Sequence, residues 1–160
     1  MSDNQNSDPS AAPARKPSRR RQNRVATMQF LYLFETNRDE NLNDLLLSFF
    51  ESRDKEREYY QFAEELIHGT IEHLEEIDAR IQSLASNWKL ERIARVDLAI
   101  LRMACFELLY RRDIPPVVTI NEAIDLGKEY SNEESRRFLN GIVKSLSSCG
   151  IFFALTSETW

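Results

Sequence analysis

Glycine, proline and cysteine are scarce in this sequence of 160 residues, which contains 4, 5 and 2 of them. Glycine and proline interrupt helices and form turns, so their scarcity favours long helices over many short strands. The two cysteines, Cys105 and Cys149, form no CxxC spacing, which argues against a disulfide framework and against a zinc site. Hydrophobic residues (42%) and charged residues (29%) are as abundant as in ordinary globular proteins.

Long uncharged apolar runs are missing as well. No stretch approaches the roughly 18 apolar residues that a membrane span needs. Residues 1–18 lack the apolar segment of a secretory signal, so we expect a cytoplasmic protein. Because these residues are rich in Ser, Pro, Ala and Asn, we expect them to form a disordered tail before a folded domain over residues 19–146.

The net charge of −5 is unevenly distributed. No acidic residue lies between Pro9 and Phe34, where six basic residues occur: Arg15, Lys16, Arg19, Arg20, Arg21 and Arg24. The rest of the chain therefore carries −11. A basic block on an acidic body is typical of proteins that bind nucleic acid. A solvated, charged terminus is the alternative, and charge alone does not separate the two.

Apolar residues recur at helical spacing along most of the chain, and no strand pattern or repeat occurs, so we predict an all-α fold. Ser18 is placed to cap a first helix that ends near Glu35. A short helix over residues 45–50 and a long helix over residues 55–86 follow. Gly69 interrupts the long helix, which predicts a bend or a close helix contact there.

The helix predicted over residues 93–111 is the most apolar. Within residues 96–110 only Asp97, Arg102 and Glu107 are charged, and the other twelve residues are apolar. Because apolar side chains surround this helix, we expect it to be the buried central element. Its three charges fall on different faces, so they cannot form one catalytic cluster. Each needs its own partner or an exposed position.

Two capping boxes predict the last helix starts. After Pro115-Pro116 ends the previous helix, Thr119-Ile-Asn-Glu122 would open one helix, and Ser131-Asn-Glu-Glu134 would open another that reaches Leu146. Residues 147–160 contain an apolar stretch with three open interpretations. They pack back on the domain, extend the last helix or bind a partner.

Motifs for catalysis, nucleotide binding and metal binding are absent from the sequence. His68 and His73 are five residues apart and do not share a helix face. We therefore expect no catalytic site, no metal and no cofactor.

The basic block has a geometry that suits RNA. On a helix that starts by Arg19, the side chains of Arg20, Arg21 and Arg24 fall within an arc of about 100°. Without carboxylates nearby in sequence, three guanidiniums on one face suit phosphate contacts and stacking on unpaired bases. The alternative is a solvated first turn, although cations at a helix N-terminus oppose the helix dipole. We expect all three side chains to project outside the core.

Four stretches together resemble the NusB family: RRRQNRVATMQFLYLFE (19–35), NWKLERIARVDLAILRMACFEL (87–108), PPVVTINEAIDLGKEYS (115–131) and RRFLNGIVKSL (136–146). The combination of VDxxILR, INEAI and FLNG is specific. The resemblance implies two packed helical bundles and a non-catalytic function. Such proteins pair with NusE, a small-subunit ribosomal protein, and bind the single-stranded boxA element of nascent RNA. The complex then helps RNA polymerase to read through terminators, notably in ribosomal RNA operons.

The resemblance also implies roles for individual residues. The RNA-binding residues would be Arg20, Arg21, Arg24, Arg137 and Phe138. The partner-binding residues would be Tyr32, Glu91 and Asp97. Structural interpretations stay open for two of these, because Phe138 also fits a core position and Asp97 also fits an ion pair with Arg95 or Arg102.

Two other functions compete with this one. The chain would be a helical protein-interaction module if its arginines bound an acidic protein instead of RNA. It would alternatively be an RNA-binding domain related to those of ribosomal RNA cytosine methyltransferases. That function needs a nucleotide-binding α/β domain with a catalytic cysteine, for which this sequence shows no pattern.

Overall fold

The computed structural model describes residues 16–156, and side chains as far as Ser148. Most of the tail predicted over residues 1–18 lies outside the described residues. Within them the chain is all-α, as predicted, and its elements are α1 (Arg19–Thr36), α2 (Leu42–Glu51), η1 (Arg57–Tyr60), α3 (Gln61–Glu72), α4 (Leu74–Leu84), η2 (Leu90–Arg92), α5 (Arg95–Tyr110), α6 (Pro116–Tyr130) and α7 (Glu133–Thr156). None of these helices combines the length and apolarity that crossing a membrane requires.

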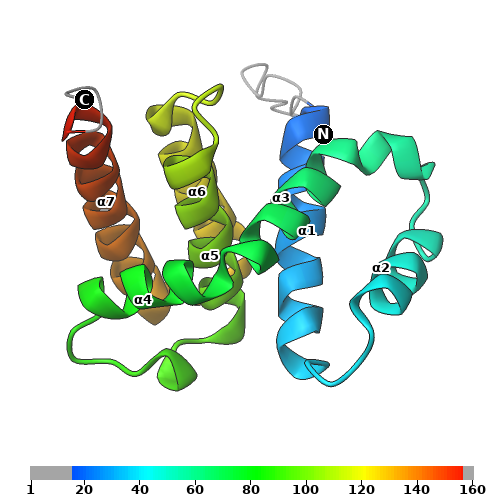
Figure 1. Cartoon of the computed structure of the whole chain (residues 1–160), viewed down its shortest axis with the longest axis horizontal. Coiled ribbons are helices and arrows are strands. Elements are labelled where there is room, and N and C mark those ends of the chain that lie inside the picture. The colour runs from blue at the N-terminus through cyan, green and yellow to red at the C-terminus, as the bar shows by residue number, and fades with distance from the viewer. Residues whose placement is uncertain (1–15, 157–160) are drawn as a thin grey trace, which may run out of the picture.

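The helices form two packed bundles that share α1 and α3, which confirms the predicted fold. One buried cluster joins α1, α2, η1 and α3 through residues such as Phe30, Phe49 and Ile67. A larger cluster joins α1, α3, α4, α5, α6 and α7 around Ile100 and Leu101. In Figure 1, α1 stands between α2 on one side and α6 and α7 on the other. The first helix therefore belongs to both cores.

The caps predicted for three helix starts can be compared with the structure. The Ser18 hydroxyl accepts a hydrogen bond from the Arg21 backbone N–H at 3.1 Å, as predicted. The prediction for Thr119 is wrong, since α6 already begins at Pro116, where a proline lacks only a hydrogen bond that the first turn does not need. The last helix is capped by Asn132, not by Ser131, because the Asn132 side chain accepts from the Ser135 backbone N–H at 2.8 Å.

The prediction of one long helix over residues 55–86 is wrong. The structure divides it into η1, α3 and α4, with the break at His73. The close helix contact predicted at Gly69 is confirmed, because a Cβ atom there would lie 2.0 Å from Cζ of Phe106 in α5. The bend comes one turn later, where the His73 ring stacks on Tyr110 with 4.0 Å between ring centroids.

Helix α5 is the buried centre of the larger bundle, as predicted. Arg102 is 3% exposed and bonds both Asp78 of α4 at 2.8 Å and Glu35 of α1 at 2.5 Å. Burial alone would raise the pKa of Glu35, but the hydrogen bond and charge of Arg102 outweigh it and leave that pKa below its ordinary value. Because Arg102 is committed to these two carboxylates, the ion pair proposed between Asp97 and Arg102 does not form.

The thiol of Cys105 is fully buried in α5, and this burial raises its pKa to about 12. Since the thiolate is the reactive form, we expect a Cys149→Ser variant to resist alkylation at neutral pH while it is folded. Mass spectrometry after treatment with iodoacetamide, with and without denaturant, measures this. Labelling only after denaturation is expected, whereas rapid labelling of the folded protein would contradict the buried position.

Candidate nucleic-acid and partner interface

The basic start of α1 holds its arginines in different environments. Arg19 donates to the backbone carbonyls of Glu58 at 2.6 Å and Tyr59 at 3.0 Å, so it ties α1 to η1. Arg20 is exposed, and its guanidinium lies over the ring of Phe62, 4.5 Å from the centroid. Among the described residues, Arg20 has no hydrogen-bonding or ion-pair partner for its side chain. Its donors are therefore open to a ligand.

Arg21 faces α6. Its guanidinium bonds Glu122 at 2.9 Å and Glu129 at 3.3 Å, and its side chain is 17% exposed. Although burial lowers the pKa of Arg21, its bonds to these carboxylates raise that pKa above the ordinary value. Arg21 is thus a partly exposed cation that two carboxylates of α6 hold in place.

Arg24 does not project from the surface, and the expectation that all three arginines lie outside the core and away from carboxylates is wrong. The Arg24 side chain is 3% exposed and makes a bidentate pair with Glu107, with Nη2–Oε1 2.7 Å and Nε–Oε2 3.1 Å. The Thr119 hydroxyl lies 3.4 Å from the same carboxylate. The pair therefore joins α1, α5 and α6 inside the core, and its carboxylate comes from 83 residues away in sequence.

Asp97 lies in the first turn of α5 and is 1% exposed. Its Oδ1 is buried and has no hydrogen-bond partner among the described residues. The side chain borders a pocket of about 270 Å³ whose other lining residues are Trp88, Arg92, Ile93, Ala94, Glu134, Ser135 and Phe138. With Asp97 and Glu134 against Arg92, the pocket has an excess of one negative charge and aromatic walls. It suits a basic side chain.

The predicted RNA-binding residues fall into two groups. Arg137 is exposed on α7, and the neighbouring Phe138 is half-buried with its ring 6.3 Å from that of Trp88. In Figure 1, α1 begins at the top of the molecule, whereas α7 begins near the bottom. The segment between α4 and α5 also lies at the bottom. Phe138 lines the Asp97 pocket, and none of the arginines of α1 is among the residues that line it.

The predicted partner-binding residues sit on two elements besides α5. Tyr32 is 43% exposed on α1, and Glu91 is exposed in η2. Neither residue lines the Asp97 pocket, although Arg92, next to Glu91, does. Their roles in partner binding stay predictions.

Trp88 is a site residue that the sequence analysis missed. It is 52% exposed, which is unusual for the largest apolar side chain, and it lines the Asp97 pocket. The available signal was a tryptophan in a polar connection between two predicted helices. Exposed tryptophans of this kind are enriched where proteins bind partners.

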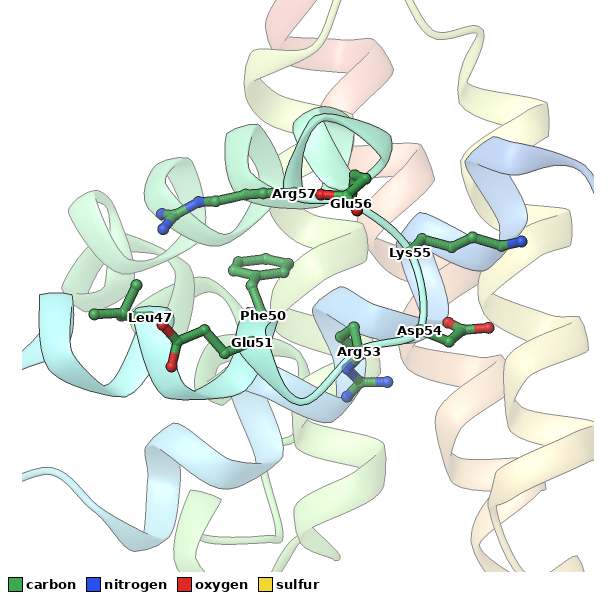
Figure 2. A pocket seen from close by; sticks show the side chains of 8 residues that line it. All are labelled: Leu47, Phe50, Glu51, Arg53, Asp54, Lys55, Glu56 and Arg57. Atoms are coloured by element: carbon green, nitrogen blue, oxygen red, sulfur yellow. The ribbon is translucent and has the colours of Figure 1, made fainter.

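A second concave surface lies on α2 and the segment that leads to η1, and its lining residues are labelled in Figure 2: Leu47, Phe50, Glu51, Arg53, Asp54, Lys55, Glu56 and Arg57. Three basic residues are balanced there by three acidic residues. Two of its arginines are also occupied, since Arg53 bonds Gln29 at 2.7 Å and Arg57 bonds Glu64 at 2.6 Å. This surface has no charge excess that would attract RNA.

Known proteins resemble this chain over most of its length. A sequence model of the NusB family matches residues 21–148. The transcription antitermination protein NusB of Trichlorobacter lovleyi is 44% identical over 130 residues, which cover 81% of this chain and 91% of that protein. The NusB protein of Geobacter sulfurreducens is 43% identical over 129 residues, which cover 81% of this chain and 94% of that protein.

Solved structures agree with the sequence match. The structure of T. maritima NusB has a TM-score of 0.73 at 36% identity, covering 84% of this chain and 93% of that one. A chain in the crystal structure of antitermination factors NusB and NusE with double-stranded RNA has a TM-score of 0.71 at 25% identity, covering 82% of this chain and 97% of that one. Because sequence and fold agree over nearly the whole described domain, this chain belongs to the NusB family.

Proposed function

We propose that this protein is a non-catalytic transcription antitermination factor that acts in the cytoplasm. It binds boxA-type single-stranded RNA together with a NusE-type ribosomal protein, as part of an antitermination complex on RNA polymerase. Its relatives are named transcription antitermination proteins, and one solved complex contains NusB, NusE and double-stranded RNA. The folded unit for this function is the domain over residues 19–146.

The RNA contacts of this proposal start at α1. Arg20 supplies an exposed positive charge at its first turn, and Arg21 is partly buried and paired with Glu122 and Glu129. Arg24 supports the helix from inside the core. Arg137 and Phe138 would contact RNA on α7. A single strand can contact both α1 and α7 because its backbone is extended and its unpaired bases are free to stack on side chains. We therefore expect single-stranded RNA to bind more tightly than duplex.

The observation that carries the proposal is the unpartnered carboxylate of Asp97. Leaving a buried polar oxygen without a hydrogen bond costs about 1–3 kcal/mol, so stability does not explain why an acidic residue stands there. A basic side chain from the partner would provide the missing bond, and a ribosomal protein offers many such side chains. Phe138 lines the same pocket, so the partner and RNA surfaces adjoin there.

Replacing Asp97 by asparagine keeps the shape of the side chain and removes its charge. We expect Asp97→Asn to weaken association with the NusE-type protein by about 1.4–2.8 kcal/mol, or roughly 10- to 100-fold. Isothermal titration calorimetry measures this. The melting temperature should not fall, because no protein bond to the carboxylate is lost.

Asp44→Asn is the matched control, since Asp44 also lies in the first turn of a helix but is exposed. It should leave association unchanged. Equal affinity of wild type and Asp97→Asn would remove the Asp97 pocket from the partner surface.

The alternative function, a helical protein-interaction module, would be supported instead if the protein bound no RNA with or without the NusE-type protein.

A further inference from the structure

We infer that Phe62, the second residue of α3, is a positioning residue that holds Arg20 ready for an RNA phosphate group. This inference rests on the proposed RNA-binding function and adds to it a residue from outside the basic block. Three guanidiniums surround the Phe62 ring, from Arg20 at 4.5 Å, Arg24 at 5.3 Å and Arg111 at 5.4 Å. Two come from α1, and the third from the residue that follows α5.

Among the described residues, Arg20 is the one of these three guanidiniums that is not bonded to a carboxylate. Arg24 is occupied by Glu107 in the core. Arg111 is held by Glu65 at 2.7 Å and by Asp113 at 2.9 Å. Arg20 contacts the ring face and has no carboxylate or carbonyl partner within the described part of the chain. A guanidinium that lies over a ring makes no hydrogen bond to it, so its N–H donors can still meet phosphate oxygens bidentately.

The surroundings of Arg20 form a cleft of about 340 Å³, lined by Arg19, Arg20, Asn23, Gln61, Phe62 and Glu65. Its two arginines against one glutamate give it an excess of positive charge on a protein whose net charge is −5. Arg19 is held in place by its bonds from Nε and Nη2 to backbone carbonyls, and it adds positive charge to the cleft. The cleft therefore offers a phosphate group the unpaired guanidinium of Arg20, and the Phe62 ring fixes where that guanidinium lies.

The physical reason is preorganisation. A free arginine side chain loses much rotational freedom when it binds a phosphate. The contact with Phe62 removes part of that freedom before binding, so less of the free energy of the phosphate contact is lost to ordering the side chain. Replacement of the ring by an aliphatic side chain of similar size should leave the charge in place and weaken the contact.

The test is a double-mutant cycle on boxA RNA binding by the full chain in the presence of the NusE-type protein. Arg20→Ala should weaken binding and reduce the slope of log K against log salt by about 0.7, the value of one phosphate contact on a single strand. Phe62→Leu should weaken binding about two- to fivefold, as expected for an exposed cation–π contact. Phe62→Tyr, which keeps the ring, should bind like wild type.

The double variant separates positioning from a general structural effect. If Phe62 acts through Arg20, then Phe62→Leu has no further effect on affinity once Arg20 is alanine. Arg57→Ala is the charge control: its guanidinium also lies over a phenylalanine, Phe50, but is bonded to Glu64. It should leave RNA affinity within the error of wild type.

Three outcomes would overturn the inference. If Arg20→Ala weakens binding and Phe62→Leu does not, the stack has no role in positioning, while the proposed RNA contact stands. If the effect of Phe62→Leu persists in the Arg20→Ala background, Phe62 acts through the fold. If Arg20→Ala itself leaves affinity and salt dependence unchanged, the RNA contact at α1 fails and the inference fails with it.

Discussion

Replacing Glu107 by alanine is expected to destabilise the protein by about 3–5 kcal/mol, because it leaves the Arg24 guanidinium charged and unpaired in the core. Both side chains of the pair are at most 3% exposed, so water cannot replace the lost carboxylate. Urea denaturation followed by circular dichroism measures the free energy of unfolding. For a domain of this size, such a loss removes a large part of the total stability.

The Arg24–Glu107 pair can be distinguished from simple loss of volume. A double variant, Arg24→Met with Glu107→Leu, replaces the pair by apolar side chains and should recover most of the lost stability. A loss below about 1 kcal/mol in Glu107→Ala would show that the pair is solvated and would return Arg24 to the surface as an RNA contact.

Replacing Gly69 by alanine is expected to destabilise the protein by about 1–3 kcal/mol, even though alanine is the better helix former by about 1 kcal/mol. The new Cβ would lie 2.0 Å from Cζ and 2.3 Å from Cε2 of Phe106, a ring that is only 7% exposed and packed among other residues of the core. Either the ring or the backbone of α3 must move. Thermal or urea unfolding measures the cost.

Gly141→Ala in α7 is the matched control, because a Cβ atom there meets nothing within 4 Å. It should stabilise the protein by up to about 1 kcal/mol through helix propensity alone. If Gly69→Ala were as stabilising as Gly141→Ala, then α3 and α5 would not be in the close contact described here.

The sequence predicted those parts of the fold that depend on local pattern. The Ser18 cap and the buried helix over residues 93–111 follow from side chains that are neighbours in sequence, and both were found. The break at His73 was not foreseen, because apolar spacing continues across it. The chain turns there to pack α4 across the larger bundle, and packing between distant segments leaves no local signal.

In the candidate site, too, the sequence indicated local features but not the contacts between distant segments. Of the three charges on α5, the sequence showed that each needed a partner or an exposed position, but it could not name the partners. Arg102 and Glu107 find theirs on other helices, and Asp97 does not. Arg24 looked free because its carboxylate lies 83 residues away. Only the structure shows that one arginine of the predicted face supports the core while Arg20 stays open.

The central claim is that Arg20 and Arg21, at the start of α1, bind the phosphates of single-stranded RNA. The most direct test is a salt titration of boxA RNA binding in the presence of the NusE-type protein, with wild type and an Arg20→Ala, Arg21→Ala variant. Since Arg24 is not replaced, the variant should keep the melting temperature close to that of wild type.

If each of the two arginines neutralises one phosphate, the slope of log K against log salt should become shallower by about 1.4 in the variant. Its affinity for single-stranded RNA should fall, and wild type should prefer single-stranded RNA to a duplex of the same sequence. A variant with the slope and affinity of wild type would contradict the claim.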